Sequence, residues 1–386
     1  MNSGPTIFLS AGEASGDIHG AELARELVRR IPGVRLLGLG GSRMEAAGVE
    51  RLAGLDRLAV LGLAEVVRHL PDLLRLRREV YAALARESVD LVVPIDYPGF
   101  NLPLAGEAHG RGIPVLYYIA PQVWAWKERR ARRLAEWCDE VCVVLPFEAE
   151  LLARYGARAR FVGHPLLDHA PPAPSTGERT AVGVFPGSRR QEVDRMLPVF
   201  LEAARRAAAP DGRPILVART PDLPAAAYAD CPADWLVPPE EVLAGSRAAI
   251  TKSGTITLQL AIAGVPMVIG YRVHPLTFGI LRSLVRVEHV GLVNLVAGRA
   301  IVRECLQSRM TPGNLADAVR PLLGDGPERA AVVADLDEVR GRLGSPGAAG
   351  RVAEACVRLL EGRAPAGGRS AGAGPVETET PGTGSA

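Results

Sequence analysis

The sequence predicts an α/β protein built from two doubly wound domains, and three observations support this fold class. Short runs rich in β-branched residues alternate with helix-like patterns along most of the chain, which is typical of βαβ units around a mostly parallel sheet. The chain of 386 residues is also longer than one ordinary core requires, because domains usually contain about 150 residues. Finally, prolines and small polar residues interrupt the alternation over residues 161–180, after which it starts again.

The first half of the chain supplies the strand-and-helix repeats of one domain. Strand-like and helix-like segments follow one another at 6–10 and 21–30, 89–96 and 102–112, 113–120 and 127–137, and 140–146 and 147–156. We therefore expect an N-terminal Rossmann-like domain over residues 1–168.

The second half repeats the pattern and then loses it. Its strand-like and helix-like segments lie at 181–188, 192–208, 213–218, 248–254, 255–264 and 265–271. We expect a second Rossmann-like domain over residues 169–343, followed by a helix over 344–362 that packs back on the N-terminal domain. Residues 363–386 contain too few large apolar side chains to offset the entropy of ordering, which predicts a disordered tail.

The charge balance and the cysteines exclude several classes of protein. Lysine and arginine number 45 and aspartate and glutamate 43, so the formal charge of +2 gives no global field that would recruit nucleic acid. The odd number of cysteines has no framework spacing, which indicates reduced thiols in a cytosolic compartment. They are Cys138, Cys142, Cys231, Cys305 and Cys356. No neighbouring residues complete a four-ligand zinc set, and we expect neither a metal nor a cofactor.

Residues 61–78 are the candidate membrane contact. The sequence has no signal-peptide pattern and no run of the roughly 20 apolar residues that span a bilayer. In this segment apolar residues recur at helical spacing with arginines interleaved, which favours an amphipathic surface at a membrane interface. The apolar residues are Leu63, Val66, Val67, Leu70, Leu73 and Leu74. Packing into the core is the alternative explanation.

The turn after the first predicted strand is the first of four candidate sites, because ligands of open α/β sheets bind at the carboxyl ends of the strands. Its glycines are spaced by four, unlike the G-x-G-x-x-G fingerprint, and Glu13 and Asp17 would repel a pyrophosphate. The turn suits sugar hydroxyls or the acceptance of a proton, with Gly12, Glu13, Ser15 and Gly16 as substrate-binding residues. Alternatively, Asp17 caps the helix that follows.

The second site follows the strand over 89–96. Asp96 ends this strongly apolar strand, and partial removal from water would raise its pKa toward the range of a general base. Asn101 opens the next helix and is a further candidate for substrate binding. An aspartate that caps a helix or shapes a turn is the alternative.

The third site lies between a strand and a helix start. Free backbone N–H groups, the hydroxyl of Ser188 and the guanidinium of Arg189, together with the Gly187 turn, make a candidate anion site. A plain turn is the alternative.

The fourth site opens the helix after the strand that begins at residue 248. Ser253, Gly254 and Thr255 again favour phosphate, and Gln259 one turn later is placed to meet a ribose hydroxyl. Two anion-binding turns in one domain predict a nucleotide diphosphate.

In this order the motifs resemble the lipid-A-disaccharide synthase family of GT-B glycosyltransferases. The matching segments cover about residues 5–345 and read AGEASGD, GLGGSRMEAAG, IDYPGFN, YYIAPQVWAWKERR, LPFE, FVGHPL, FPGSRRQEV, SGTITLQLAIAGVPMV and NLVAGRAIVRECLQ. The resemblance implies two domains facing across a cleft, the first binding the acceptor and the second the nucleotide sugar. It also implies that Asn294 contacts UDP.

The activity implied by the resemblance is the transfer of 2,3-diacylglucosamine from UDP to 2,3-diacylglucosamine 1-phosphate. The products would be a β-1,6-linked disaccharide 1-phosphate and UDP, formed with inversion. The reaction would take place at the cytoplasmic face of the inner membrane. Assembly into a homodimer is left as an open alternative. The sequence departs from the family at Gln259, where glutamate is usual, at Lys127, where arginine is expected, and at Val293, where proline is usual.

These residues suggest roles in an inverting transfer. We assign the base to Asp96, with Asp17 as second candidate, because inversion needs one base on the face opposite the leaving group. Ser188, Arg189 and the 253–255 turn would stabilise charge on the departing diphosphate. Two rivals stay open: another GT-B transferase or epimerase that acts on a soluble UDP-sugar, and a non-catalytic relative that binds a nucleotide sugar or a lipid.

Overall fold

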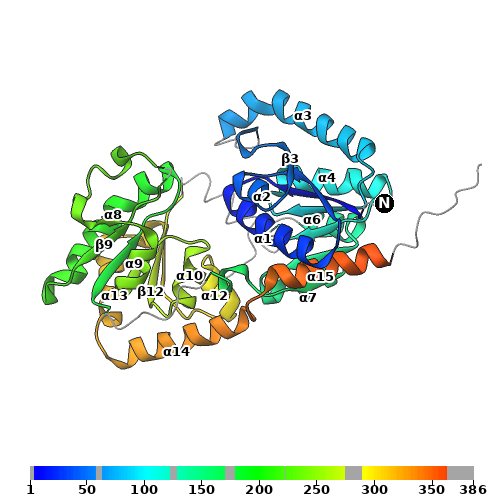
Figure 1. Cartoon of the computed structure of the whole chain (residues 1–386). Helices are drawn as coiled ribbons and strands as arrows, with labels where there is room; N and C mark the ends of the chain where they lie inside the picture. Colours follow the sequence, from blue (N-terminus) through cyan, green and yellow to red (C-terminus); the bar gives the residue numbers. More distant parts are fainter. Residues whose placement is uncertain are drawn as a thin grey trace, which may run out of the picture.

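The computed structural model contains two parallel sheets, one in each of two lobes (Figure 1), as the fold class predicts. The structure describes residues 4–57, 63–121, 128–169, 179–221, 223–273 and 289–362. The predicted tail over 363–386 lies outside these residues. The first lobe is the seven-stranded sheet with strand order β3-β2-β1-β4-β5-β6-β7, and the second lobe is the six-stranded sheet with order β10-β9-β8-β11-β12-β13.

The first lobe alternates strands and helices along the chain. Its strands are β1 (Thr6–Ala11), β2 (Arg35–Leu39), β3 (Glu50–Ala53), β4 (Leu91–Ile95), β5 (Leu116–Tyr118), β6 (Glu140–Val143) and β7 (Ala159–Phe161). Its helices are α1 (Ala14–Arg30), α2 (Ser42–Ala46), α3 (Leu63–Arg86), α4 (Pro98–Gly110), α6 (Glu128–Trp137) and α7 (Pro146–Ala153).

The second lobe repeats this alternation and ends in three helices. Its strands are β8 (Ala181–Phe185), β9 (Ile215–Ala218), β10 (Leu236–Val237), β11 (Ser246–Thr251), β12 (Met267–Tyr271) and β13 (Glu304–Leu306). Its helices are α8 (Arg190–Ala208), α9 (Pro239–Gly245), α10 (Ile256–Ile262), α12 (Leu292–Ala297), α13 (Pro312–Val319) and α14 (Pro327–Arg342). The last helix, α15 (Ala348–Glu361), packs against α1 of the first lobe.

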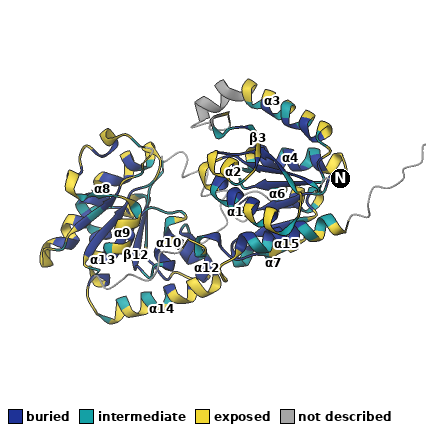
Figure 2. Cartoon of the chain, in the orientation of Figure 1, coloured by how far each residue is buried: buried dark blue, intermediate teal, exposed yellow. Residues whose placement is uncertain are grey.

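Burial on both faces explains why the central strands are continuous apolar runs. Every residue of β1, β4 and β8 is buried, and Figure 2 shows the strands as the buried centre of each lobe. Alternate residues of β1 face different clusters: Leu9 packs in the core that contains Leu23 of α1, whereas Phe8 packs with Phe100 of α4. Helices therefore cover both faces of the sheet.

The strand order also determines where ligands can bind. In the first sheet the order reverses between β1 and β4, and in the second between β8 and β11. In doubly wound sheets the turns at such a reversal separate and leave a crevice at the carboxyl ends of the strands. The four turns selected from the sequence are the turns that follow these four strands.

The helix α3 contains the candidate membrane contact. The side chains of Leu63, Val66, Val67 and Leu70 lie outside the described residues. Leu73 is half-buried against the first-lobe core, as the core-packing alternative predicts, whereas Leu74 is 40% exposed. Within the described part of the chain, no helix is both long enough and apolar enough to cross a bilayer.

Candidate active site

The turns after β1 and β4 meet at the first-lobe reversal. Ala11 pairs with Ile95, the last residue of β4, so Gly12 and Asp96 follow neighbouring positions of the sheet. Gly12 is required because the ring of Tyr97 occupies the space that a Cβ atom would need. The turn after β1 is therefore packed directly under the residue that follows Asp96.

Asp96 has a backbone conformation that its neighbours hold in place. Asp96 and Tyr97 have φ angles of 46° and 47°, in the left-handed region, where non-glycine residues carry a strain of order 1–3 kcal/mol each. The Asp96 N–H donates to the Tyr118 carbonyl at 2.9 Å. The Asp96 carbonyl accepts from the Tyr117 hydroxyl and from the Asn101 amide, both at 2.8 Å. These three bonds fix the direction in which the Asp96 side chain leaves the sheet.

The Asp96 carboxyl has the pKa of a base that works near neutral pH. Burial, reinforced by the negative charge of Glu13, raises its pKa to about 6. A hydrogen bond from the Tyr97 backbone and the nearby His19 oppose this rise. The carboxyl is thus ionised at pH 7 and still basic enough to take a proton. Burial thus raises the pKa of Asp96, as the sequence predicts.

Asn101 supports Asp96 from inside the protein, whereas the sequence suggests it as a substrate-binding residue. It is fully buried, and its amide nitrogen also donates to the carbonyls of Ser10 and Ile95 at 3.0 Å. Its amide oxygen accepts from the Ser10 hydroxyl at 2.6 Å. Because these bonds use the amide inside the protein, Asn101 joins the ends of β1 and β4 beneath Asp96.

Asp17 is also committed to the fold. Its buried carboxylate accepts backbone N–H bonds from Gly41 at 2.7 Å, from Met44 at 3.0 Å and from Arg43 at 3.1 Å. These donors form the start of α2, so Asp17 caps α2 and not the helix α1 in which it lies. Because these three bonds occupy the Asp17 carboxylate inside the protein, Asp96 remains the first candidate for the base.

The rest of the first turn divides into packing residues and accessible ones. Gly16 is buried, and a Cβ atom there would lie 3.2 Å from the Cβ of Ala11, so it allows α1 to approach β1. Glu13 and Ser15 are exposed, and the Ser15 hydroxyl donates to Glu13 at 3.0 Å. Among the predicted substrate-binding residues, Glu13 and Ser15 are therefore the two that present side chains to solvent.

In the second lobe, the turn after β8 differs from the prediction in one respect. Ser188 and Arg189 are exposed, as an anion site requires, but their backbone N–H groups are not free. They donate to the carboxylate of Glu192 at 3.1 and 3.4 Å. Gly187 has a φ of 129° and makes the turn possible. The side chains of Ser188 and Arg189, and not these two amides, are available to a ligand.

The turn after β11 lies beside the turn after β8. The Ser253 hydroxyl donates to the Val290 carbonyl at 2.7 Å, Gly254 has a φ of 145°, and the Thr255 side chain is exposed. Lys252 precedes the turn and bonds through its N–H to the Phe185 carbonyl at the end of β8, at 3.0 Å. The two predicted anion turns are therefore adjacent in space.

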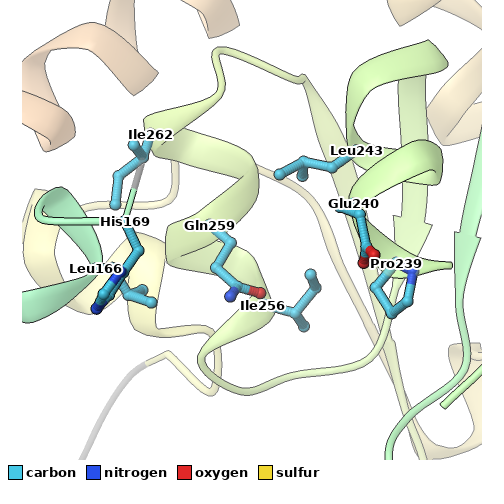
Figure 3. A pocket seen from close by; sticks show the side chains of 8 residues that line it. All are labelled: Leu166, His169, Pro239, Glu240, Leu243, Ile256, Gln259 and Ile262. Atoms are coloured by element: carbon cyan, nitrogen blue, oxygen red, sulfur yellow. The ribbon is translucent and has the colours of Figure 1, made fainter. Parts of the chain in front are cut away.

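Gln259 lines a pocket between the lobes, with a volume of about 220 Å³ (Figure 3). In that figure Gln259 and Ile256 of α10 lie across from Leu166 and His169, which follow the first-lobe sheet, and Glu240 of α9 completes one wall. Gln259 lies one turn along α10 from the anion turn, and its contact with a ribose stays a prediction.

Asn294 is internal, whereas the resemblance implies that it contacts UDP. It is fully buried; its oxygen accepts from the N–H groups of Ile301 and Val302 at 3.0 Å. Its nitrogen donates to the Val302 carbonyl at 3.0 Å and to Glu304 at 2.8 Å. The Glu304 carboxylate in turn accepts from the N–H of Val290 at 3.0 Å. Asn294 therefore supports the loop that the Ser253 hydroxyl contacts.

Four residues of this site were not selected from the sequence. Tyr117 and Tyr118 hold the Asp96 backbone, and their position on a strand next to β4 follows from the strand order, not from a motif. Glu192 has the spacing of a capping box, three residues after Arg189, and this signal could have identified it. Lys252 is a cation directly before a predicted anion turn.

Comparison with known families agrees with this geometry. A family model described as lipid-A-disaccharide synthetase matches residues 7–340. The chain belongs to this family. The lipid-A-disaccharide synthase of Anaeromyxobacter sp. (strain K) is 42% identical over 373 residues, covering 92% of this chain and 97% of that relative. That of Syntrophus aciditrophicus (strain SB) is 40% identical over 380 residues, covering 94% and 99%. The resemblance carried by the motifs is thus confirmed.

Solved structures confirm the GT-B fold. MurG of Acinetobacter baumannii matches with a TM-score of 0.57 at 16% identity, covering 92% of this chain and 99% of that chain. A putative UDP-N-acetylglucosamine 2-epimerase of Listeria monocytogenes matches with a TM-score of 0.65 at 14% identity, covering 93% and 97%. Transferases and an epimerase share the fold, so the family, and not the fold, decides between the rivals.

Proposed function

We propose that this chain transfers 2,3-diacylglucosamine from UDP to the 6-hydroxyl of 2,3-diacylglucosamine 1-phosphate, with inversion. Membership of the lipid-A-disaccharide synthetase family supports the formation of this disaccharide. The observation that carries the mechanism is Asp96, a carboxyl with a pKa of about 6 held at the carboxyl end of β4.

In the proposed step Asp96 takes the proton of the acceptor hydroxyl while the hydroxyl oxygen attacks the anomeric carbon of the donor sugar. The bond from that carbon to the diphosphate oxygen breaks, and the electron pair leaves with UDP. A base with this pKa would be ionised before the reaction and protonated after it. Glu13 keeps the carboxyl basic through its negative charge and, being exposed, could also bond acceptor hydroxyls.

The second lobe would bind the leaving group. The side chains of Ser188 and Arg189 and the Ser253–Thr255 turn are proposed to stabilise charge on the diphosphate, with Gln259 at the ribose. The adjacent turns support this arrangement, since Lys252 joins the ends of β8 and β11. No step of this scheme calls for a metal ion.

An assay by mass spectrometry tests the proposal. The wild-type chain, incubated with UDP-2,3-diacylglucosamine and 2,3-diacylglucosamine 1-phosphate, should yield the disaccharide 1-phosphate and one UDP per disaccharide. Replacing the acceptor with a non-acylated sugar phosphate is the control and should give little product. UDP binding without product from either acceptor would instead identify a non-catalytic relative, and equal turnover of a soluble sugar would identify a different transferase.

Both substrates carry acyl chains, so we further propose that the protein rests on the cytoplasmic face of the inner membrane, with α3 as the contact. Leu74 is the described residue that supports this, because it is a large apolar side chain that is 40% exposed. Leu74→Ser should lower the sedimentation of the protein with anionic lipid vesicles by about fivefold, because the variant buries less apolar surface in the membrane.

Val28→Ser is the matched control, because Val28 on α1 is also a large apolar side chain with an exposed surface. Its sedimentation should equal that of the wild type. Equal losses in the two variants would remove α3 from the proposal. We also propose a homodimer, and sedimentation velocity measures whether the protein forms one.

A further inference from the structure

A partly buried ion pair joins the two turns of the second lobe. The Lys252 ammonium contacts the Glu192 carboxylate at 3.1 Å, and the two side chains are only 16% and 17% exposed. Glu192 belongs to the first turn of α8, and Lys252 follows β11. The pair therefore joins two segments that are 60 positions apart in the chain.

The turn after β8 is built around the Glu192 carboxylate. One carboxylate oxygen accepts the N–H groups of Ser188 and Arg189. Gly187 leaves the space for this side chain, because a Cβ atom there would lie 2.6 Å from the Cβ of Glu192. The space beside Gly187 is filled by the Glu192 side chain, whose Oε2 atom would also lie 2.6 Å from such a Cβ atom.

The other half of the pair fixes the second turn. The Lys252 N–H bonds to the Phe185 carbonyl, and its ammonium lies 3.3 Å from the position of a Cβ atom on Gly254. Both charges are largely shielded from water. Removing Glu192 would leave the Lys252 ammonium without its carboxylate at low dielectric, which is strongly unfavourable, whereas removing Lys252 would leave Glu192 with the more distant Arg189 guanidinium at 3.5 Å. Each turn thus depends on the charge supplied by the other.

We propose that Glu192 and Lys252 form a brace that sets the spacing of the two turns for the diphosphate. The proposal rests on the nucleotide site proposed above and makes it more specific. Since the carboxylate uses the amides of Ser188 and Arg189, the diphosphate oxygens meet the side chains of these residues instead. The Arg189 side chain is 69% exposed and thus accessible to a ligand. Glu192 and Lys252 are positioning residues, which do not touch the nucleotide.

A double-mutant cycle measured on UDP tests the brace. In Glu192→Gln and in Lys252→Met the Kd for UDP and the KM for the donor should each rise about tenfold, the scale of coupling between contacting residues. The KM for the acceptor and kcat should change less than about twofold. The double variant should bind UDP no worse than either single variant, and Lys252→Arg, which keeps the charge, should recover most of the affinity.

Asp194→Asn is the matched control. Asp194 lies on the same helix and pairs with Arg190 at 2.7 Å, but both side chains are about half exposed. Pairs of this kind contribute little, so its Kd for UDP should equal that of the wild type. Tighter binding of UDP in Glu192→Gln would show that the carboxylate competes with the ligand, and it would overturn the brace. Unchanged binding would overturn it as well.

Amide hydrogen exchange without any ligand separates this inference from the proposed function. The N–H groups of Ser188 and Arg189 should exchange slowly in the wild type and at least tenfold faster in Glu192→Ala, as expected when a hydrogen-bond acceptor is removed. Fast exchange in the wild type would contradict the brace. If the wild type shows slow exchange but binds no UDP, the proposed function fails while the ion pair keeps its role in ordering the two turns.

Discussion

Each lobe brings two turns together at the carboxyl ends of its central strands, and the environment of Glu192 in one pair of turns differs from that of Asp96 in the other. Glu192 in the second lobe accepts two backbone N–H groups and pairs with Lys252. Asp96 in the first lobe forms no ion pair with a cation among the described residues, and burial raises its pKa to about 6. In the proposed mechanism, the partners of a carboxylate, more than its place in the fold, separate the structural role of Glu192 from the reactive role of Asp96.

The same contrast exists within the first lobe. Asp17 and Asp96 follow neighbouring strands, but the Asp17 carboxylate accepts hydrogen bonds from three N–H groups at the start of α2. Asp96 instead has its backbone held by Tyr117, Tyr118 and Asn101, which leaves its carboxylate to react. The Asp17 carboxylate stabilises the fold, whereas the fold disfavours the ionised form of the Asp96 carboxyl and so raises its pKa.

The largest expected effect comes from Asp96→Asn. Loss of the base should lower kcat by about 10² to 10⁴, the usual contribution of general base catalysis, with little change in the Kd for UDP. Product formation followed by mass spectrometry measures the first quantity and calorimetry the second. Turnover within tenfold of the wild type would assign the base elsewhere.

Stability should change in opposite directions in the two aspartate variants. The raised pKa of Asp96 means that its charged form destabilises the fold above about pH 6, so Asp96→Asn should raise the Tm at pH 8. Asp17→Asn retains only one acceptor oxygen for its three donors and should lower the Tm. Thermal unfolding of both proteins at pH 8 measures this difference, and equal shifts would remove the contrast.

The two buried asparagines provide the next comparison. Asn101→Ala should lower kcat by roughly 10-fold to 100-fold, because small misplacement of a reacting group has effects of this size, and leave the donor KM nearly unchanged. Asn294→Ala removes a similarly buried amide from the second lobe and should raise the donor KM instead. Steady-state kinetics of both variants measures these effects, and comparable losses in Tm would show that stability does not cause the difference. A lower kcat in Asn294→Ala alone would contradict this division.

The dependence on pH should follow the Asp96 carboxyl. Since the ionised form is the base and its pKa is about 6, kcat/KM should fall about tenfold per pH unit below pH 6 and be constant from pH 7 to 8. Glu13→Gln removes a negative charge that raises this pKa, so the acid limb should move to lower pH. A limb that stays in place would mean that Glu13 does not act on Asp96.

The smallest expected effect belongs to Gln259→Glu, which restores the residue usual in the family. A charged acceptor bonds a hydroxyl more strongly than a neutral amide, by about 1 kcal/mol, so UDP should bind about fivefold tighter. Calorimetry with UDP measures this, and Gln259→Ala should weaken binding by a similar factor. No change in either variant would place the ribose away from α10.

Much of the fold and part of the site follow from the sequence. Continuous apolar strands predict two parallel sheets, because such strands are buried on both faces. Asp96 and Arg189 lie in the turns after those strands, and Gln259 lies on the helix α10 that follows. The inward position of the Asn101 and Asn294 side chains was not predicted. A local motif does not reveal whether a polar side chain is turned inward, since their partners, such as Ser10 for Asn101, lie up to 91 residues away.

A crystal structure with UDP bound is the most direct test of the account. The account predicts that the diphosphate lies against the side chains of Ser188 and Arg189 and the 253–255 turn, with the ribose at Gln259. Glu192 should remain on its two backbone N–H groups, and the Asp96 carboxylate should face the departing oxygen across the gap between the lobes. UDP bound in the first lobe, or a diphosphate that has displaced Glu192 from those amides, would contradict it.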